Sequence, residues 1–193
     1  MAKRGFLGVS SNCAIGWRTA ALFVLLLFFF ILFPCHVKAA EFQSRYATIH
    51  YENDQQVRKL NNELFLSRNL GYRLRERKLI TVQDEVGAKI DLLIEQVQVV
   101  LEMFPERIKF DLFLFDNAAE AQKELFRRYG KKVDFISFYS RRENALYLSA
   151  RDGELKVVAH ELAHVVLEHY FKPSPPVKVH EVLAQYAAGH IAD

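Results

Sequence analysis

Residues 154–170, with the sequence ELKVVAHELAHVVLEHY, decide how the rest of the chain is interpreted. Apolar residues recur in this stretch at intervals of three and four, and no proline interrupts them, so it predicts one helix from Glu154 to about Tyr170. Two histidines, His160 and His164, stand four residues apart in it. Residues at this spacing lie on the same side of a helix, one turn apart. The pattern therefore predicts two imidazoles that face the same point in space.

Imidazoles placed in this way can bind a single zinc ion at bond lengths of about 2.0–2.1 Å. Glu161 follows the first histidine, so its carboxylate leans toward the metal without binding it and can take a proton from the water that zinc activates. The flanking residues, among them Val158 and Val166, are uncharged, as expected for a helix that is buried on both sides of its metal-facing side. The stretch HELAH at residues 160–164 thus predicts a zinc site with Glu161 as the general base.

A catalytic zinc usually has three protein ligands and one open position. Glu181 comes seventeen residues after His164, within KVHEVLAQY at residues 178–186. Ser174 followed by two prolines is a good helix start, which places Glu181 inside a second helix, and the short loop at residues 171–173 keeps the two helices close. The neighbouring His180 lies about 100° round that helix. It is either an alternative third ligand or a residue that lines the pocket.

The combination of HELAH at residues 160–164 and HEVLAQY at residues 180–186 resembles the gluzincins, the zinc metallopeptidases that include thermolysin and related aminopeptidases. In them a glutamate on a following helix is the third ligand, and the resemblance gives that role to Glu181. It also implies a zincin-like fold, in which an extended peptide lies along an edge strand of the sheet. By this resemblance the edge strand consists of Ala145, Leu146, Tyr147, Leu148 and Ser149.

The residue that stabilises the oxyanion of the transition state is not assigned by the resemblance. His180 and Val182 stand where the gluzincins commonly have Asn and Gly, and twelve residues follow Glu181, where larger gluzincins have a further subdomain. Gln185, one turn from Glu181, can accept a hydrogen bond from a ligand imidazole. Side chains that can donate to the oxyanion, with packing as the competing explanation, are Tyr147, Tyr170, Tyr186 and His190.

The region before residue 154 alternates between strand and helix patterns. Aromatic and β-branched residues predict strands at residues 42–52, 108–115, 135–139 and 144–150. Helical spacing predicts helices at residues 53–67, at 81–103 with Thr81 as the cap, and from a cap at Asp116 or Asn117 to residue 130. This order is α+β, with a small mixed or antiparallel sheet packed against helices. We interpret the basic segment 71–78 as a solvated turn or face, and the aromatic strands at residues 110–115 and 135–139 as core.

Residues 1–39 differ from the rest of the chain, since they carry four basic side chains, no acidic one and a 14-residue apolar run at residues 20–33. The run is shorter than the about 20 residues of a membrane span and suits a signal peptide. Val37 and Ala39 fit the −3 and −1 positions of a cleavage site, so we expect cleavage after Ala39. The alternative is an uncleaved membrane tether through residues 20–33. Both place the remaining domain outside the cytoplasm, in the periplasm or the extracellular space.

Residues 40–193 carry 22 basic and 23 acidic side chains. This balance disfavours a protein that binds nucleic acid through its phosphates. A length of 154 residues fits a single domain with a core of its own. The two cysteines, Cys13 and Cys35, both lie in the leader, so no disulfide is expected in the domain.

Together these patterns predict an exported, single-domain zinc peptidase that hydrolyses a peptide or protein substrate. One zinc ion per chain is held by His160, His164 and Glu181, and Glu161 is the general base. The alternative is a non-catalytic, zinc-stabilised protein-binding module of the cell envelope. The glutamate at position 161 favours the peptidase, because a purely structural zinc site does not need it. The sequence leaves the substrate, the choice between endopeptidase and exopeptidase, and the oligomeric state open.

Overall fold

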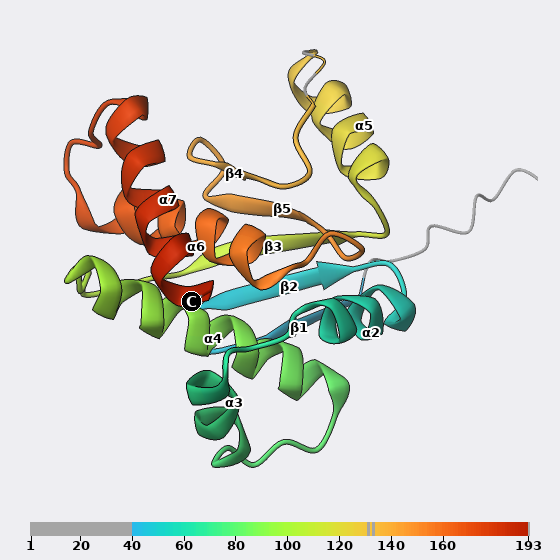
Figure 1. Cartoon of the computed structure of the whole chain (residues 1–193). Helices are drawn as coiled ribbons and strands as arrows, with labels where there is room; N and C mark the ends of the chain where they lie inside the picture. Colours follow the sequence, from blue (N-terminus) through green and yellow to red (C-terminus); the bar gives the residue numbers. More distant parts are fainter. Residues whose placement is uncertain (1–39, 131, 133, 193) are drawn as a thin grey trace, which may run out of the picture. The chain divides into compact units, whose positions relative to one another are not determined.

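The strands form one mixed sheet in the order β1–β2–β3–β5–β4 (Figure 1). The computed structural model describes residues 40–130, 132 and 134–192. The elements of this part are β1 (Ala40–Gln43), β2 (Ala47–Tyr51), α2 (Asp54–Glu63), α3 (Arg68–Arg75), α4 (Val82–Leu101), β3 (Phe110–Phe115), α5 (Ala118–Tyr129), β4 (Phe138–Ser140), β5 (Ala145–Ser149), α6 (Leu155–Tyr170) and α7 (Val177–Ala192). Strands β2, β3 and β5 are parallel, whereas β1 and β4 are antiparallel to their neighbours. The described residues therefore form an α+β protein, as predicted.

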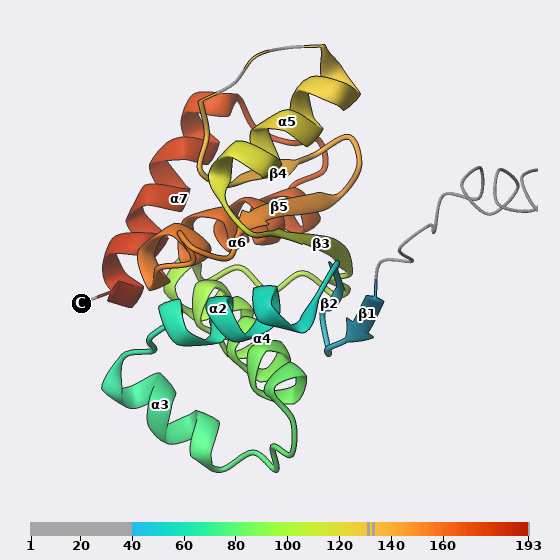
Figure 2. The ribbon, with the colours of Figure 1, turned by 90° about the vertical axis from the view of Figure 1, so that its right-hand side faces the viewer.

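Helices cover both faces of this sheet. On one face, α2, α4 and α6 pack against a core that includes Ile49, Leu112 and Leu146. On the other face, Leu125 of α5 packs against Ala145 and Tyr147. Figure 2 shows α5 and α6 on opposite sides of β5. Since alternate residues of a strand point to opposite faces, every residue of β5 is buried.

The prediction that β5 is the edge strand was wrong. Its residues, Ala145, Leu146, Tyr147, Leu148 and Ser149, lie between β3 on one side and β4 on the other. The chain folds back through the turn at residues 141–144, so β4 pairs with β5 and takes the outer position. The strand predicted at residues 135–139 accordingly begins only at Phe138.

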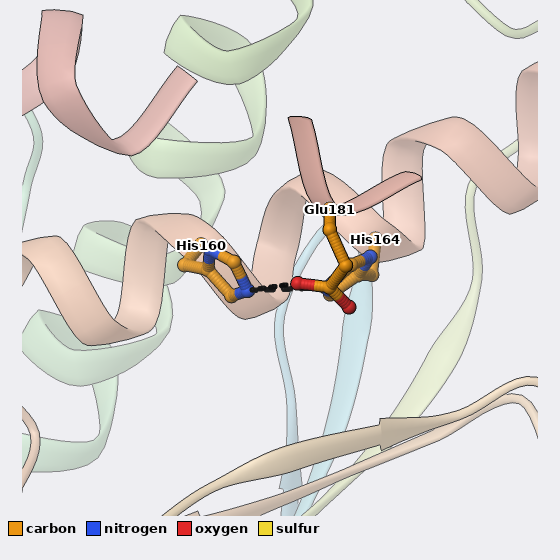
Figure 3. A group of neighbouring side chains, drawn as sticks. All are labelled: His160, His164 and Glu181. Atoms are coloured by element: carbon orange, nitrogen blue, oxygen red, sulfur yellow. Dashed lines mark hydrogen bonds and ion pairs between the residues drawn. The ribbon is translucent and has the colours of Figure 1, made fainter. Parts of the chain in front are cut away.

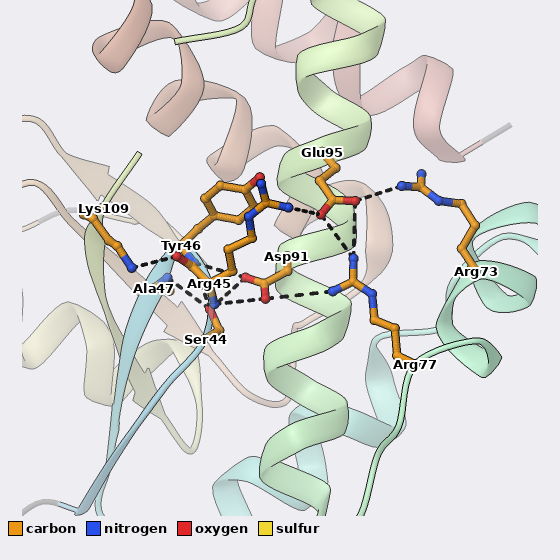
Figure 4. Close-up of polar contacts among 9 residues, drawn as sticks. All are labelled: Ser44, Arg45, Tyr46, Ala47, Arg73, Arg77, Asp91, Glu95 and Lys109. Atoms are coloured by element: carbon orange, nitrogen blue, oxygen red, sulfur yellow. Dashed lines mark hydrogen bonds and ion pairs between the residues drawn. The ribbon is translucent and has the colours of Figure 1, made fainter. Parts of the chain in front are cut away.

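The strand predicted at residues 42–52 is two strands, β1 and β2, joined by a tight turn (Figure 4). The buried carboxylate of Asp91 in α4 holds this turn, because it accepts hydrogen bonds from Ser44 Oγ at 2.8 Å, Arg45 N–H at 3.0 Å and Tyr46 N–H at 3.2 Å. Asp91 is 45 to 47 residues away in sequence from these three residues. The local pattern of aromatic and β-branched residues therefore does not reveal the turn.

The basic segment 71–78 does more than form a solvated turn or face. The helix predicted at residues 53–67 ends at Glu63, and a separate helix, α3, begins at Arg68. Arg73 and Arg77 form ion pairs with Glu95 of α4 at 2.8 Å and 3.1 Å (Figure 4). Two of the basic residues thus attach α3 and the loop after it to α4.

Two predicted helix starts are confirmed by their hydrogen bonds. Thr81 Oγ1 accepts from the Asp84 N–H at 3.0 Å at the start of α4, and Asn117 Oδ1 accepts from the Glu120 N–H at 3.1 Å at the start of α5. Such contacts satisfy backbone groups that have no partner within the first helical turn. Helix α5 ends at Tyr129, and Gly130 follows it with a φ of +65°, a left-handed conformation that glycine adopts readily.

The predicted signal peptide at residues 1–39, with its apolar run at residues 20–33 and its cleavage site after Ala39, lies outside the described residues. Within the part that the structure describes, no helix has both the length and the apolarity of a membrane span. Residues 40–192 belong to one compact unit.

Candidate metal centre

Helix α6 carries the two histidines and is held firmly in the core. It spans Leu155–Tyr170, close to the predicted residues 154–170. Val158, Leu162 and Val166 are completely buried. The side chains of His160 and His164 are 25% and 14% exposed to solvent. Between residues 158 and 167 the helix is therefore covered except at the two histidines.

Helix α7 lies against α6 and brings Glu181 to the histidines. The contact uses small side chains, since Ala184, Ala187 and Ala188 of α7 are all buried, and small residues let two helices approach closely. The helix begins at Val177 rather than at the predicted Ser174. Ser174 does not start the helix, and its Oγ lies 2.7 Å from Glu168 Oε1.

The side chains of His160, His164 and Glu181 converge on one point (Figure 3). The two Nε2 atoms are 3.2 Å apart. Glu181 Oε2 lies 3.5 Å from His160 Nε2, and Glu181 Oε1 lies 3.6 Å from His164 Nε2. A tetrahedral zinc with bonds of about 2.0–2.1 Å separates its ligand atoms by about 3.3 Å. The three side chains therefore fit a zinc ion, with a fourth position left for water or substrate.

Both histidines favour the neutral form that metal binding requires. Burial lowers the pKa of His160, although the Glu181 carboxylate opposes this shift. Burial is also the largest cause that lowers the pKa of His164, to about 4, and the charges of His160, His180 and Arg141 act in the same direction. Protons therefore do not compete for the two imidazoles at neutral pH. Two neutral imidazoles and one carboxylate are a donor set that zinc accepts.

Glu161 has a different environment from Glu181. It is only 8% exposed and lines the same cavity as the three ligand side chains. Burial raises the pKa of its carboxyl group to about 7, while a hydrogen bond from the Tyr139 backbone lowers the pKa and the charge of Glu181 raises it. A carboxyl group with a pKa near neutrality can both accept and return a proton. The structure thus places a suitable acid–base group beside the ligand set.

In the metal-free protein we expect Glu161 to make the free energy of unfolding fall as the pH rises. The folded state keeps the Glu161 proton up to about pH 7, whereas the unfolded chain releases it near pH 4.5, so the contribution is fully present below pH 4.5 and is lost by about pH 7. The shift corresponds to about 3 kcal/mol. Glu161→Gln cannot ionise, so its advantage in unfolding free energy over the wild type should grow by about this amount toward pH 8. Urea denaturation with a chelator present measures it.

The comparison with Glu161→Gln also removes the opposite effect of His164. The lowered pKa of His164 makes stability decrease as the pH falls from 6.5 toward 4, and this contribution is common to both proteins. A difference in unfolding free energy that stays constant between pH 4.5 and about pH 8 would contradict the burial of an ionisable Glu161.

His180 lies behind His164 and outside the ligand group. Its ring stacks on that of His164, with centroids 5.7 Å apart. His180 Nε2 is 3.0 Å from Glu168 Oε1 and 2.9 Å from Ser174 Oγ. Because these contacts engage Nε2, the structure favours Glu181 over His180 as the third ligand. His180 does line the cavity, which was the other role considered for it.

The wall opposite the helices was not recognised from the sequence as part of the site. Residues of the segment 135–141 line a cavity of about 270 Å³ around the ligand side chains and an adjoining cavity of about 650 Å³ beside His160 and Glu161. Phe135 and Ile136 are 55% and 48% exposed. The interpretation of residues 135–139 as core was therefore wrong at this end. These residues are exposed because the segment lies at the edge of the sheet. The local sequence pattern contains no signal for that position.

The side chains considered as oxyanion donors do not line the 270 Å³ cavity. Tyr147 is buried on the α5 face and bonds to Glu143. Tyr170 is 46% exposed and packs on Phe171, and Tyr186 is 49% exposed beside His190, with ring centroids 4.0 Å apart. Gln185 is exposed and lines the neighbouring 650 Å³ cavity, not the one around the ligand side chains. The structure therefore places none of them at the ligand group.

Comparison with known proteins identified no relative of this chain. A scan against protein-family models, a search of curated proteins and a search of solved structures each found no match. The interpretation of the site accordingly depends on the residues and the geometry described above.

Proposed function

We propose that this protein is a zinc-dependent peptidase of the gluzincin type, with a zincin-like fold, that acts outside the cytoplasm. The observation that carries the proposal is the convergence of the ligating atoms of His160, His164 and Glu181, all within 4.8 Å of one another, beside the buried carboxyl group of Glu161. A buried carboxylate that binds no metal costs the fold stability. Such a group in the wall of a cavity is a candidate for a catalytic role.

Each group of the site has a distinct role in this reaction. Zinc, when bound, supplies a Lewis acid that polarises the scissile carbonyl and lowers the pKa of water. Glu161 lines the cavity beside the ligand side chains, so it can take the proton of the attacking water and pass it to the nitrogen of the leaving amine. His160, His164 and Glu181 hold their positions through the packing of α6 against α7.

Strand β4 supports a peptide as the substrate. It is the outer strand at this end of the sheet, and Phe138 and Tyr139 line the same cavity as Glu161. An edge strand presents free backbone groups that can pair with an extended peptide. Ser137 Oγ, just before β4, is buried and has no hydrogen-bond partner among the described residues.

Digestion of a peptide library by the purified, zinc-loaded protein tests the proposal. A peptidase produces fragments that disappear when zinc is chelated and return when zinc is added back, and mass spectrometry identifies the cleaved bonds. The alternative, a zinc-stabilised binding module, retains peptides without cutting them. An intact library in the presence of zinc-loaded protein would favour that alternative.

A further inference from the structure

The cavity around the zinc-binding side chains has a cationic wall residue, Arg141. Among the described residues that line this cavity, it is the only arginine or lysine. Arg141 belongs to the turn between β4 and β5, so it faces the cavity from the sheet side, whereas the ligands come from α6 and α7. Its positive charge can therefore attract a negatively charged group that is bound between the sheet edge and these two helices.

Glu168 holds Arg141 in place and leaves part of it available. Arg141 Nε lies 2.5 Å from Glu168 Oε1, and the Arg141 side chain is still 47% exposed. Because this contact uses Nε, the two Nη groups of the guanidinium are not needed for it. Arg141 lines the same cavity as His160, His164 and Glu181.

Two other polar side chains of the cavity are already engaged, whereas Ser137 Oγ is unpaired but carries no charge. Tyr139 donates its hydroxyl hydrogen to Asn144 Oδ1 at 2.8 Å, and His180 Nε2 contacts Glu168 and Ser174. Glu161 and Glu181 are acidic and repel a negatively charged oxygen. Arg141 is therefore the side chain best suited to meet negative charge on a substrate bound between the two walls.

We propose that Arg141 binds the carbonyl oxygen of the scissile peptide bond and stabilises the negative charge that develops on it, an inference that rests on the proposed peptidase function. When the water oxygen bonds to the carbonyl carbon, the electron pair of the C=O bond moves to the carbonyl oxygen and Glu161 takes the water proton. The C–N bond then breaks, its electron pair moves to nitrogen, and Glu161 returns the proton there. Arg141 donates hydrogen bonds throughout and transfers no proton.

If Arg141 has this role, its removal weakens binding of the transition state more than binding of the substrate. Removing one oxyanion donor typically lowers kcat about 10²- to 10³-fold. Arg141→Ala should therefore lower kcat about 10²-fold with KM changed by no more than about threefold, and Arg141→Lys should recover part of the loss. Arg142→Ala is the matched control, because Arg142 is the exposed next residue and does not line the 270 Å³ cavity.

Inhibitor binding tests the role without turnover. We would compare a phosphinic peptide, which carries a tetrahedral, negatively charged group in place of the cleaved bond, with a thiol peptide of the same sequence, which binds zinc through sulfur alone. Calorimetry should show that Arg141→Ala weakens the phosphinic peptide about 10²-fold and leaves the thiol peptide, the zinc content and the Arg142→Ala control unchanged.

The outcomes separate this inference from the function on which it rests. Equal changes for both inhibitors, or no change for either, would overturn the role of Arg141 and leave the zinc peptidase standing. A zinc-loaded wild type that binds neither inhibitor and cleaves no peptide would overturn both.

Discussion

Glu161→Gln should keep its zinc and lose about 10³-fold in kcat. The amide has nearly the same shape as the carboxylate, and Glu161 is not among the three ligand side chains, so the metal site stays intact. The amide cannot take the proton of the attacking water, and general base catalysis typically contributes 10²- to 10⁴-fold. Turnover of the peptide identified by library digestion, measured beside zinc content, checks both parts of this prediction.

A second substitution on the same helix provides the control for Glu161→Gln. Glu154 stands at the start of α6 and is exposed, so Glu154→Gln removes the same charge without touching the cavity. We expect this variant to retain wild-type turnover. Equal turnover by Glu161→Gln and the wild type would show that Glu161 is not the general base.

Chelation of zinc should lower the melting temperature by about 10 °C. The ligands come from α6 and α7, so the metal joins two helices of the folded state and has no preformed site in the unfolded chain. Zinc at about 1,000 times its Kd adds about 4 kcal/mol of stability, and each kcal/mol shifts the melting temperature of a domain of this size by about 2–4 °C. Thermal unfolding with zinc and with a chelator measures the shift.

Histidine variants of α6 show whether this shift comes from the proposed site. His164→Ala removes a ligand and should melt at the same temperature with zinc and with chelator. His169→Ala removes a histidine of the same helix whose Nδ1 lies 2.8 Å from the carbonyl oxygen of Val165 and which is outside the ligand group, so its zinc-dependent shift should remain. A zinc-dependent shift that persists in His164→Ala would place the stabilising metal elsewhere.

Local sequence signals were sufficient to predict the two helices of the site. The spacing of His160 and His164, the apolar residues around them and the prolines before α7 all act within one or two turns of helix. These signals predicted α6 within one residue at its start and placed Glu181 inside α7. The caps at Thr81 and Asn117 were predictable for the same reason.

Features that depend on distant contacts were not predicted. The turn between β1 and β2 needs Asp91, and the outer position of β4 depends on its pairing with β5. The cavity wall was missed for the same reason, because Arg141 reaches Glu168 and the cavity lined by His164 only when the sheet edge lies beside α6. Periodicity and spacing describe single elements, whereas these features arise from how the elements pack.

The zinc content per chain of the purified protein, measured by elemental mass spectrometry beside His164→Ala, tests the central claim most directly. We predict about one zinc per chain in the wild type and much less in the variant, since His164 supplies one of three ligand atoms. A folded wild type that contains no zinc and takes up none when zinc is added would contradict the account.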